Sequence, residues 1–320
     1  MKKTFGEFVL SSAYSLQCVR TMKGIVKNNR VQILLETILS PFGMIKYVIR
    51  STFPEKEKKQ YEHQFAMVAI IKNEKNYIKE WLEFYKLIGV DIFYIYDNDS
   101  TDNVKEYLQE YIRSGEVIYQ KMSGKKRQCD AYNDALYRYK DSVKYMAFFD
   151  LDEFLFPAKE GDCVYNLVDE LMKSDSSIGG LVVNWLIYGS SGIKEKQDAL
   201  VMETFLKRAE EDLEENKHYK TIVNPRRAFS FICPHYPMYL RNFHAVNENL
   251  QEVTEEKIKG SYEKLRLNHY FTKSLAEYQM KKSRGMADRL DKRAEDDFKR
   301  HDKNDVYDDI ALSYVAKIKA

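Results

Sequence analysis

Short apolar runs alternate with helix-like segments between Phe65 and Asp150, and this alternation restricts the fold more than any other feature. The apolar runs have the length of buried strands, and they lie at 65–72, 90–97, 116–122 and 143–150. The segments between them carry apolar residues at helical spacing, and they lie at 76–89, 103–115 and 126–140. The order β-α-β-α-β-α-β predicts an α/β fold with a mostly parallel sheet and helices on both faces.

Polar residues gather where the predicted strands end, which is where parallel sheets bind their ligands. The four clusters are Asn73 and Glu74, Asp97 to Asp102, Ser123 to Arg127, and Asp150 to Glu153. The first cluster, "KNEKN", lacks the glycines with which dinucleotide-binding and P-loop proteins surround a pyrophosphate. The sheet is therefore expected to bind its ligand by other means.

The run "FFDLDEFLF" places Asp150, Asp152 and Glu153 among aromatic residues, where unpaired carboxylates are costly. Because strand side chains alternate, Asp150 and Asp152 are expected to point the same way. Two such carboxylates suit a hard divalent cation, Mg²⁺ or Mn²⁺, that keeps waters and substrate phosphates as further ligands. The alternative is a turn or helix cap after the strand.

Two further clusters each allow two interpretations. "YDNDSTD" (96–102) can form an Asx turn and cap the next helix, or its carboxylates can hold a nucleobase and a ribose. The cations of "GKKRQ" (124–128) can neutralise a diphosphate or can form a solvated basic turn.

Taken together, the motifs resemble GT-A glycosyltransferases of the family-2-like superfamily, and most of all the branch with glycosyltransferase family 92 and related bacterial proteins. The resemblance runs from about Phe65 to the end of the chain. It rests on the order and spacing of "IIKNE", "YDNDSTD", "KRQCDAYNDAL", "FFDLDEFLF", "NWLIYGSSG" and "LNHYFTKSLAEY". It implies a Rossmann-like GT-A fold and a metal-dependent, inverting transfer from a nucleotide-sugar, most often a UDP-sugar, to a saccharide or lipid-linked acceptor in surface polysaccharide synthesis.

The resemblance also implies roles for particular residues. Asp150 and Asp152 would form the DxD motif that holds the metal, and His269 would be a third ligand that favours Mn²⁺ over Mg²⁺. His235 is a second candidate for that third position. The nucleotide-sugar would be bound by residues at the strand ends and after His269, namely Asn73, Glu74, Asp97, Asp99, Lys126, Arg127, Asn133, Lys273 and Ser274.

The sequence also contains candidates for the acceptor site and for the catalytic base. Trp185 either stacks on a sugar of the acceptor, which would approach Gly189 and Ser190 in a loop of small residues, or is a core tryptophan. An inverting transfer needs a base for the proton of the acceptor hydroxyl. Glu153 is the candidate nearest the metal in sequence, although on a strand it would point away from Asp150. Its rivals are Glu248, Glu252 and Glu277.

The first sixty residues are basic and amphipathic, with eight lysines and arginines between Lys2 and Arg50 opposed only by Glu7 and Glu36. They are expected to form a helical extension that packs on the main domain or lies on an anionic membrane face. A polar linker, 54–64, follows. The chain then divides into the extension at 1–60, the GT-A domain at 61–275 and a helical tail at 276–320.

Composition restricts the partners and the cellular compartment that can be expected. The net charge of +2 gives no reason to expect nucleic acid as a partner. The four cysteines lie far apart without a CxxC pair, which favours a reducing compartment over a disulfide framework. No signal peptide and no apolar run long enough to span a bilayer is expected. These features predict a cytoplasmic enzyme, located at the inner face of the plasma membrane if the extension binds lipid.

Two other classes of protein fit part of the pattern. "DLDEF" also resembles the nucleophile motif of haloacid-dehalogenase-like, Mg²⁺-dependent phosphatases, although three β-α units precede it here. A non-catalytic nucleotide-sugar-binding or scaffold protein could have the same fold, although the acidic pair is intact. The sequence does not predict the sugar, the acceptor, the linkage or the oligomeric state.

Overall fold

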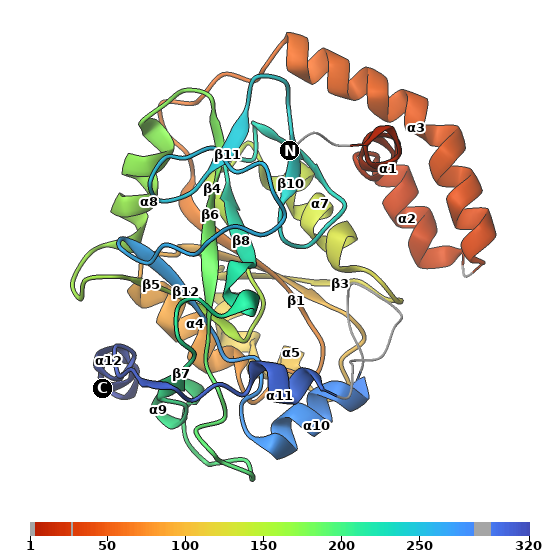
Figure 1. The fold of residues 1–320 in the computed structure, drawn as a ribbon. Coiled ribbons are helices and arrows are strands. Elements are labelled where there is room, and N and C mark those ends of the chain that lie inside the picture. The colour runs from red at the N-terminus through yellow and green to blue at the C-terminus, as the bar shows by residue number, and fades with distance from the viewer. Residues whose placement is uncertain (1–3, 27, 285–295) are drawn as a thin grey trace.

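The computed structural model describes residues 4–26, 28–284 and 296–320, and it confirms an α/β fold built on one large sheet (Figure 1). The strands of this sheet follow the order β3-β2-β1-β4-β8-β6-β12-β5, with β11 beside β6. They are β1 (His63–Ile71), β2 (Ile92–Asp97), β3 (Val117–Lys121), β4 (Val143–Phe148), β5 (Glu153–Pro157), β6 (Ile178–Ile187), β8 (Tyr219–Val223), β11 (His244–Val246) and β12 (Leu265–His269).

The four strands predicted from the alternating pattern form the parallel half of the sheet. β1 pairs in parallel with β2 and with β4, and β2 pairs in parallel with β3. The other half is mixed, because β8 is antiparallel to both β4 and β6, while β12 is parallel to β6 and antiparallel to β5. This pairing brings β8 and β12, which are distant in sequence, to the end of β4.

Helices cover both faces of the sheet, as predicted. Along β1, Met67 belongs to the core beneath α4 (Ile78–Leu87), and the next residue, Val68, belongs to the core beneath α7 (Gln128–Tyr139). This alternation follows from the period-two geometry of a strand. The predicted helix at 103–115 is divided at Leu108 into two short helices. The remaining helices of this region are α5 (Val104–Tyr107), α6 (Gln109–Arg113) and α8 (Val164–Lys173).

The N-terminal extension is helical and packs against one side of the domain (Figure 1). It consists of α1 (Phe5–Tyr14), α2 (Gln17–Ile25) and α3 (Asn29–Thr52). Helix α1 contacts β9 (Ala228–Phe231), where the Ser230 hydroxyl donates to the Ser11 carbonyl oxygen at 2.8 Å. Helix α3 lies directly on α1, since a Cβ atom at Gly43 would fall 1.9 Å from the Ser12 carbonyl oxygen.

Helix α3 corrects one expectation from the sequence. It runs for 24 residues through Pro41, and by length and composition alone it is apolar enough to cross a membrane. Sequence reasoning missed it because Glu36, Lys46 and Arg50 interrupt the apolar run, although a window of 18 residues that includes two of these charges is still apolar enough.

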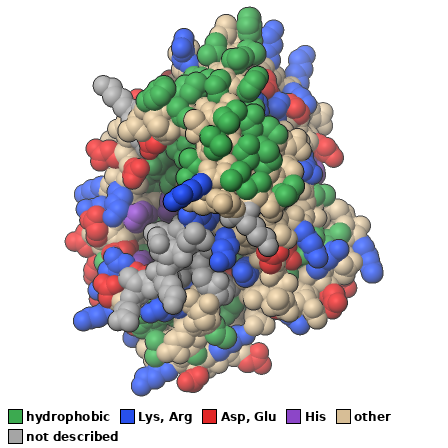
Figure 2. All heavy atoms as spheres, turned by 90° about the vertical axis from the view of Figure 1, so that its right-hand side faces the viewer, with side chains coloured by type: hydrophobic (Ala, Val, Ile, Leu, Met, Phe, Trp, Pro, Cys, Tyr) green, Lys and Arg blue, Asp and Glu red, His purple; other side chains and the backbone are tan. Residues whose placement is uncertain are grey.

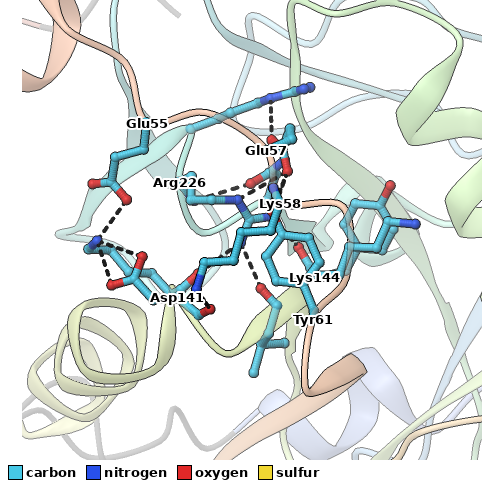
Figure 3. Close-up of polar contacts among 12 residues, drawn as sticks. Glu55, Glu57, Lys58, Tyr61, Asp141, Lys144 and Arg226 are labelled. Atoms are coloured by element: carbon cyan, nitrogen blue, oxygen red, sulfur yellow. Dashed lines mark hydrogen bonds and ion pairs between the residues drawn. The ribbon is translucent and has the colours of Figure 1, made fainter.

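The segment predicted as a polar linker, 54–64, is fastened to the domain (Figure 3). Arg226 is 2% exposed, and its guanidinium lies 3.1 Å from the Glu57 carboxylate and 4.3 Å from the centroid of the Tyr61 ring. The same guanidinium donates to the carbonyl oxygens of Val143 at 2.7 Å and Lys144 at 2.8 Å. The connection between extension and domain is therefore bound in place at the start of β4.

The C-terminal tail is helical in part. It contains α10 (Leu275–Arg284), α11 (Asp297–His301), β13 (Val306–Tyr307) and α12 (Leu312–Lys319). Strand β13 pairs with β7 (Lys207–Arg208), and Asp308 receives hydrogen bonds of 2.7 Å from both Arg208 and Arg266. The short elements that complete the fold are α9 (Val201–Thr204), the 3₁₀ helix η1 (Glu214–Lys217) and β10 (Pro237–Tyr239).

Candidate active site

The acidic cluster lies in a turn between β4 and β5. Strand β4 ends at Phe148, and the Glu153 N–H donates to the Asp150 carbonyl oxygen at 3.1 Å, which closes the turn. The prediction that strand alternation aligns Asp150 with Asp152 is therefore wrong. Trp81 of α4 holds the turn from below, because its indole N–H lies 3.2 Å from the carbonyl oxygens of both Asp150 and Glu153.

Lys220 of β8 lies beneath Asp150. Its ammonium is 2.9 Å from Asp150 Oδ2 and 3.8 Å from Glu153 Oε2, and its side chain is 1% exposed. Gln128 donates to the other Asp150 oxygen at 2.8 Å. The Asp150 carboxylate is 36% exposed, so solvent reaches it while the protein fixes its orientation. Burial alone would lower the pKa of Lys220, but Asp150 and Glu153 raise it well above its usual value, which keeps the lysine charged.

Sequence reasoning missed Lys220. The available signal was a lysine within "HYKTIV", an otherwise largely apolar run. A lysine in such a strand needs a partner, because buried charges are rarely unpaired. The partner itself could not be read from the sequence, since it depends on how β8 pairs with β4.

Asp152 lies beside His269, because β5 and β12 pair with Glu153 opposite His269. His269 Nε2 is 3.6 Å from Asp152 Oδ2, and Lys281 of α10 forms an ion pair with the same oxygen. Burial would raise the pKa of Asp152, but Lys281 and His269 hold it well below its usual range. Burial lowers the pKa of His269 against the opposing effect of Asp152.

The residue types at this turn fit a divalent cation, and two of the three predicted ligands are already neighbours. Two ligands that each lie ~2.1 Å from one ion can be up to ~4 Å apart, so the 3.6 Å between His269 Nε2 and Asp152 Oδ2 is compatible with a shared ion. Within the described residues, however, no three acidic, histidine or cysteine side chains gather closely enough to hold a metal. Asp150 is held on Lys220, and Lys281 takes the position beside Asp152.

Glu153 does not fit the predicted role of catalytic base. Its side chain is fully buried, and its two oxygens accept 2.7 Å hydrogen bonds from the Trp185 indole and the Asp150 N–H. Burial raises the pKa of Glu153 well above its usual range, with Lys220 opposing. An acceptor hydroxyl cannot reach an enclosed carboxyl, so Glu153 is a positioning residue for the Asp150 turn.

Two of the three rival bases are held by other parts of the protein. Glu248 accepts the N–H groups of Lys264 and Leu265 at 2.9 and 2.8 Å and so fixes the start of β12. Glu277 accepts a hydrogen bond from the Tyr77 hydroxyl at 2.7 Å and forms the capping box of α10. Glu252 is exposed in a loop, where its backbone is bridged to Val246.

The loops after β1 and β2 lie side by side. The Asn73 N–H donates to the Ser100 hydroxyl at 3.0 Å, and the Asn73 side chain accepts from the Thr101 N–H at 2.7 Å. Asp97 is buried and accepts hydrogen bonds from Tyr119 and the Ser100 N–H. The structure thus brings together the strand ends that the sequence singled out, and Asp97 serves the loop itself.

The neighbouring positions differ in exposure. Asp99 is exposed, and the Gly124 N–H, which donates to it at 2.9 Å, lowers the pKa of this carboxyl. Lys126 is exposed in the loop before α7. Glu74 is buried at the start of α4, where its carbonyl oxygen accepts from the Ile78 N–H at 3.0 Å. The proposed contacts of Asn73, Asp97, Asp99 and Lys126 with a donor stay predictions.

Three residues that were predicted to contact the donor instead form hydrogen bonds with other parts of the protein. Arg127 is buried and donates to the Arg20 carbonyl oxygen of α2 at 3.1 Å, so it holds the extension. Asn133 is fully buried, and its amide exchanges hydrogen bonds of 2.7 and 2.8 Å with the Phe231 backbone. Ser274 is fully buried as the cap of α10. Polar side chains in or next to helices can hydrogen-bond to backbone groups or to a ligand, and the sequence does not distinguish these two roles.

Residues of the C-terminal tail occupy the space beside the loop that was predicted to bind the acceptor. A Cβ atom at Gly189 would lie 2.3 Å from the Lys303 carbonyl oxygen, and the Ser190 N–H donates to Asp302 at 2.7 Å. This contradicts the prediction that an acceptor approaches Gly189 and Ser190. Trp185 is partly buried, and His269 packs against its ring at 4.3 Å between centroids.

Two more of the predicted site residues, His235 and Lys273, lie beside the acidic turn. His235 lies 5.3 Å from the Trp185 ring between centroids, its Nδ1 contacts the Tyr219 carbonyl oxygen at 2.9 Å, and burial lowers its pKa to about 3. Lys273 is buried, with its ammonium 3.8 Å from the centroid of the Tyr77 ring, and it contributes to the low pKa of Asp152. Both therefore lie close enough to the acidic turn to interact electrostatically with it, His235 with Asp150 and Lys273 with Asp152.

The mixed α/β sheet with helices on both faces and the acidic turn after β4 agree with the glycosyltransferase fold that the motifs indicated. The chain belongs to glycosyltransferase family 92, whose family model matches residues 65–301, and this confirms the resemblance. A family 92 protein of Ricinus communis is 24% identical over 148 residues, which are 46% of this chain and 24% of that protein. One of Arabidopsis thaliana is 28% identical over 149 residues, which are 43% of this chain and 26% of that protein.

The chain thus spans about a quarter of the length of these curated relatives. Among solved structures, TarS 1–349 of S. aureus has a TM-score of 0.33 at 16% identity and covers 51% of this chain and 47% of its own. A complex of Mycobacterium tuberculosis glucosyl-3-phosphoglycerate synthase with Mn²⁺, UDP and glucosyl-3-phosphoglycerate has a TM-score of 0.25 at 17% identity, covering 41% of this chain and 50% of its own. Similarities of this size carry no residue-level argument.

Proposed function

We propose that this protein is a glycosyltransferase that moves a sugar from a nucleotide-sugar, in the first place a UDP-sugar, to a saccharide or lipid-linked acceptor. Family membership supports the class of reaction. The observation that carries the proposal is the turn after β4, where Asp150 pairs with Lys220 and, two residues later, Asp152 lies beside His269 and Lys281. Inversion at the sugar and a place in surface polysaccharide synthesis are parts of the same proposal that rest on the resemblance.

The charges at the turn suit a diphosphate that arrives with a cation. Lys220 and Lys281 balance Asp150 and Asp152, while burial favours the neutral form of Glu153. A diphosphate alone would add negative charge beside two aspartates, and a divalent ion alone would add positive charge beside two lysines. Donor and metal are therefore expected to bind much more strongly together than either binds alone.

Each residue would then have a distinct part. Asp150, Asp152 and His269 would hold Mn²⁺ or Mg²⁺, and such an ion neutralises the charge that develops on the departing diphosphate. Lys281, whose ammonium also donates to the Phe271 carbonyl oxygen at 3.0 Å, would turn from Asp152 toward the phosphates. Lys220 and Glu153 would keep Asp150 in place from below.

The test is a panel of nucleotide-sugars incubated with the protein, with release of the nucleoside diphosphate measured in Mn²⁺, in Mg²⁺ and in chelator. Turnover should need the metal and should be lost in Asp150→Asn and Asp152→Asn. Asp212→Asn is the matched control, because Asp212 is an exposed carboxylate in the turn before η1 and not in the turn between β4 and β5. Metal-dependent hydrolysis of an aryl phosphate that is lost in Asp150→Asn, without donor turnover, would instead favour the phosphatase. Absence of any metal-dependent UDP binding would favour the scaffold.

A further inference from the structure

Helix α3 presents an apolar face that no described residue covers. Leu34, Ile38, Phe42, Ile45 and Ile49 are between 54% and 63% exposed, and they recur at the three- and four-residue spacing of one helical stripe. We call these five residues the outer face of α3. In Figure 2, hydrophobic side chains gather over the upper part of the side of the molecule that carries the extension. Apolar patches of this extent on a protein surface mark an interaction site.

The opposite side of α3 holds the helix on α1 and on the domain. Lys46 donates to the Ser15 carbonyl oxygen at 2.7 Å, and Arg50 donates to the carbonyl oxygens of Arg226 at 3.1 Å and Ala228 at 3.3 Å. If α3 crossed a bilayer, these contacts would break and two cationic side chains would enter hydrocarbon, which is costly. The outer face is therefore placed to meet a surface while the helix stays parallel to that surface.

We propose that the outer face of α3 docks the protein onto an anionic lipid surface, with the helix in the plane of the membrane. A single helix of 24 residues, about 36 Å long, with a continuous apolar stripe matches the geometry of interfacial helices. Exposed cations flank it in sequence, with Arg30 before the stripe and Lys56 and Lys59 after it. Basic residues near a membrane surface add affinity for anionic headgroups.

Charge favours lipid over a second copy of the chain as the occupant. The extension carries lysines and arginines in excess over its four glutamates, so two copies joined through α3 would bring like charges together. Anionic headgroups would instead neutralise them. The proposal is independent of the donor site, because the outer face of α3 takes no part in the acidic turn.

Vesicle flotation of the full chain tests the proposal. Wild type should float with phosphatidylcholine vesicles that contain roughly one third phosphatidylglycerol, and less with pure phosphatidylcholine. The double variant Ile38→Asp/Phe42→Asp should partition at least ~10-fold more weakly. Leu87→Asp/Leu250→Asp is the matched control, because both leucines are 45% exposed away from α3, and it should float like wild type.

Two further readouts make the result decisive. The α3 double variant should melt like wild type and keep donor turnover in solution, because its changed side chains are exposed and remote from the acidic turn. Light scattering should show the same mass for both proteins without vesicles. The proposal is overturned if wild type fails to float, if the α3 variant floats equally well, or if wild type is a dimer that the variant converts to a monomer.

Discussion

The ammonium of Lys220 lies 2.9 Å from Asp150 Oδ2, with the lysine almost completely enclosed and the aspartate partly open to solvent. The core thus fixes the orientation of the carboxylate, which solvent still reaches. Lys220→Met keeps the shape of the side chain and removes the charge. We expect it to lower stability by ~3 kcal/mol, since it breaks a buried ion pair, and to abolish donor turnover. Urea unfolding and nucleoside diphosphate release measure the two effects.

A double-mutant cycle separates this pair from general damage. In the Asp150→Asn background, Lys220→Met should cost at least ~1 kcal/mol less than in wild type, because the partner charge is already gone. Equal costs in both backgrounds would mean that Lys220 contributes by packing alone.

Trp185→Phe tests how much the hydrogen bond to the buried Glu153 carboxyl contributes to stability. The substitution removes the indole N–H that donates to Glu153 Oε1 at 2.7 Å and leaves that oxygen without this bond in the interior. Stability should fall by ~1–3 kcal/mol. In a Glu153→Met background the same change should cost less, and unfolding midpoints compare the two. If Trp185 served only to stack on a sugar, its replacement would alter acceptor use and leave stability nearly unchanged.

Arg226→Met tests whether the connection to the extension is part of the folded domain. It removes the ion pair with Glu57 and leaves the carbonyl oxygens of Val143 and Lys144 without their donor, so we expect a loss of ~3 kcal/mol or more. The neighbouring Arg227→Met is a milder comparison, because Arg227 lies 3.4 Å from the same Glu57 but donates to a single carbonyl oxygen, that of Ile178, and it should cost ~1–2 kcal/mol. Equal effects on the unfolding midpoint would count against Arg226 as the anchor.

Asp308 makes the stability of the tail depend on pH. Burial would raise the pKa of this carboxyl, but Arg266 and Arg208 lower it to about 2. A lowered folded-state pKa contributes stability that is present above the unfolded value of 3.8 and is lost as pH falls from there toward 2. The shift corresponds to roughly 2 kcal/mol at neutral pH.

Urea unfolding between pH 2 and 7 checks this contribution. Asp308→Asn should be less stable than wild type at pH 7, and the difference should shrink toward pH 2. The exposed neighbour Asp309→Asn should follow the wild-type curve. A difference between Asp308→Asn and wild type that does not change with pH would contradict the account.

The parallel half of the fold could be predicted because its signals are local. Each strand from β1 to β4 is a short apolar run, and the helices between them show their period within a dozen residues. His269 was found through the family motif, and the pairing of β12 with β5 puts it beside Asp152. Its role as a metal ligand stays a prediction.

The rest of the site depends on strand pairings and turns that the local sequence does not specify. Lys220 reaches Asp150 because β8 pairs antiparallel with β4, and no pattern in the sequence specifies that register. Glu153 turns inward because the chain bends after Phe148, whereas the alternation rule assumed a continuous strand. Arg127 faces away from the proposed donor because α2 packs over it, a contact between residues 107 positions apart.

Binding of UDP tests the central claim most directly. Isothermal titration in Mn²⁺ and in chelator should give metal-dependent binding to wild type and to Asp212→Asn, and none to Asp150→Asn or Asp152→Asn. If all four proteins bound UDP equally, or if binding were the same in chelator, the acidic turn would not be the site of the donor diphosphate.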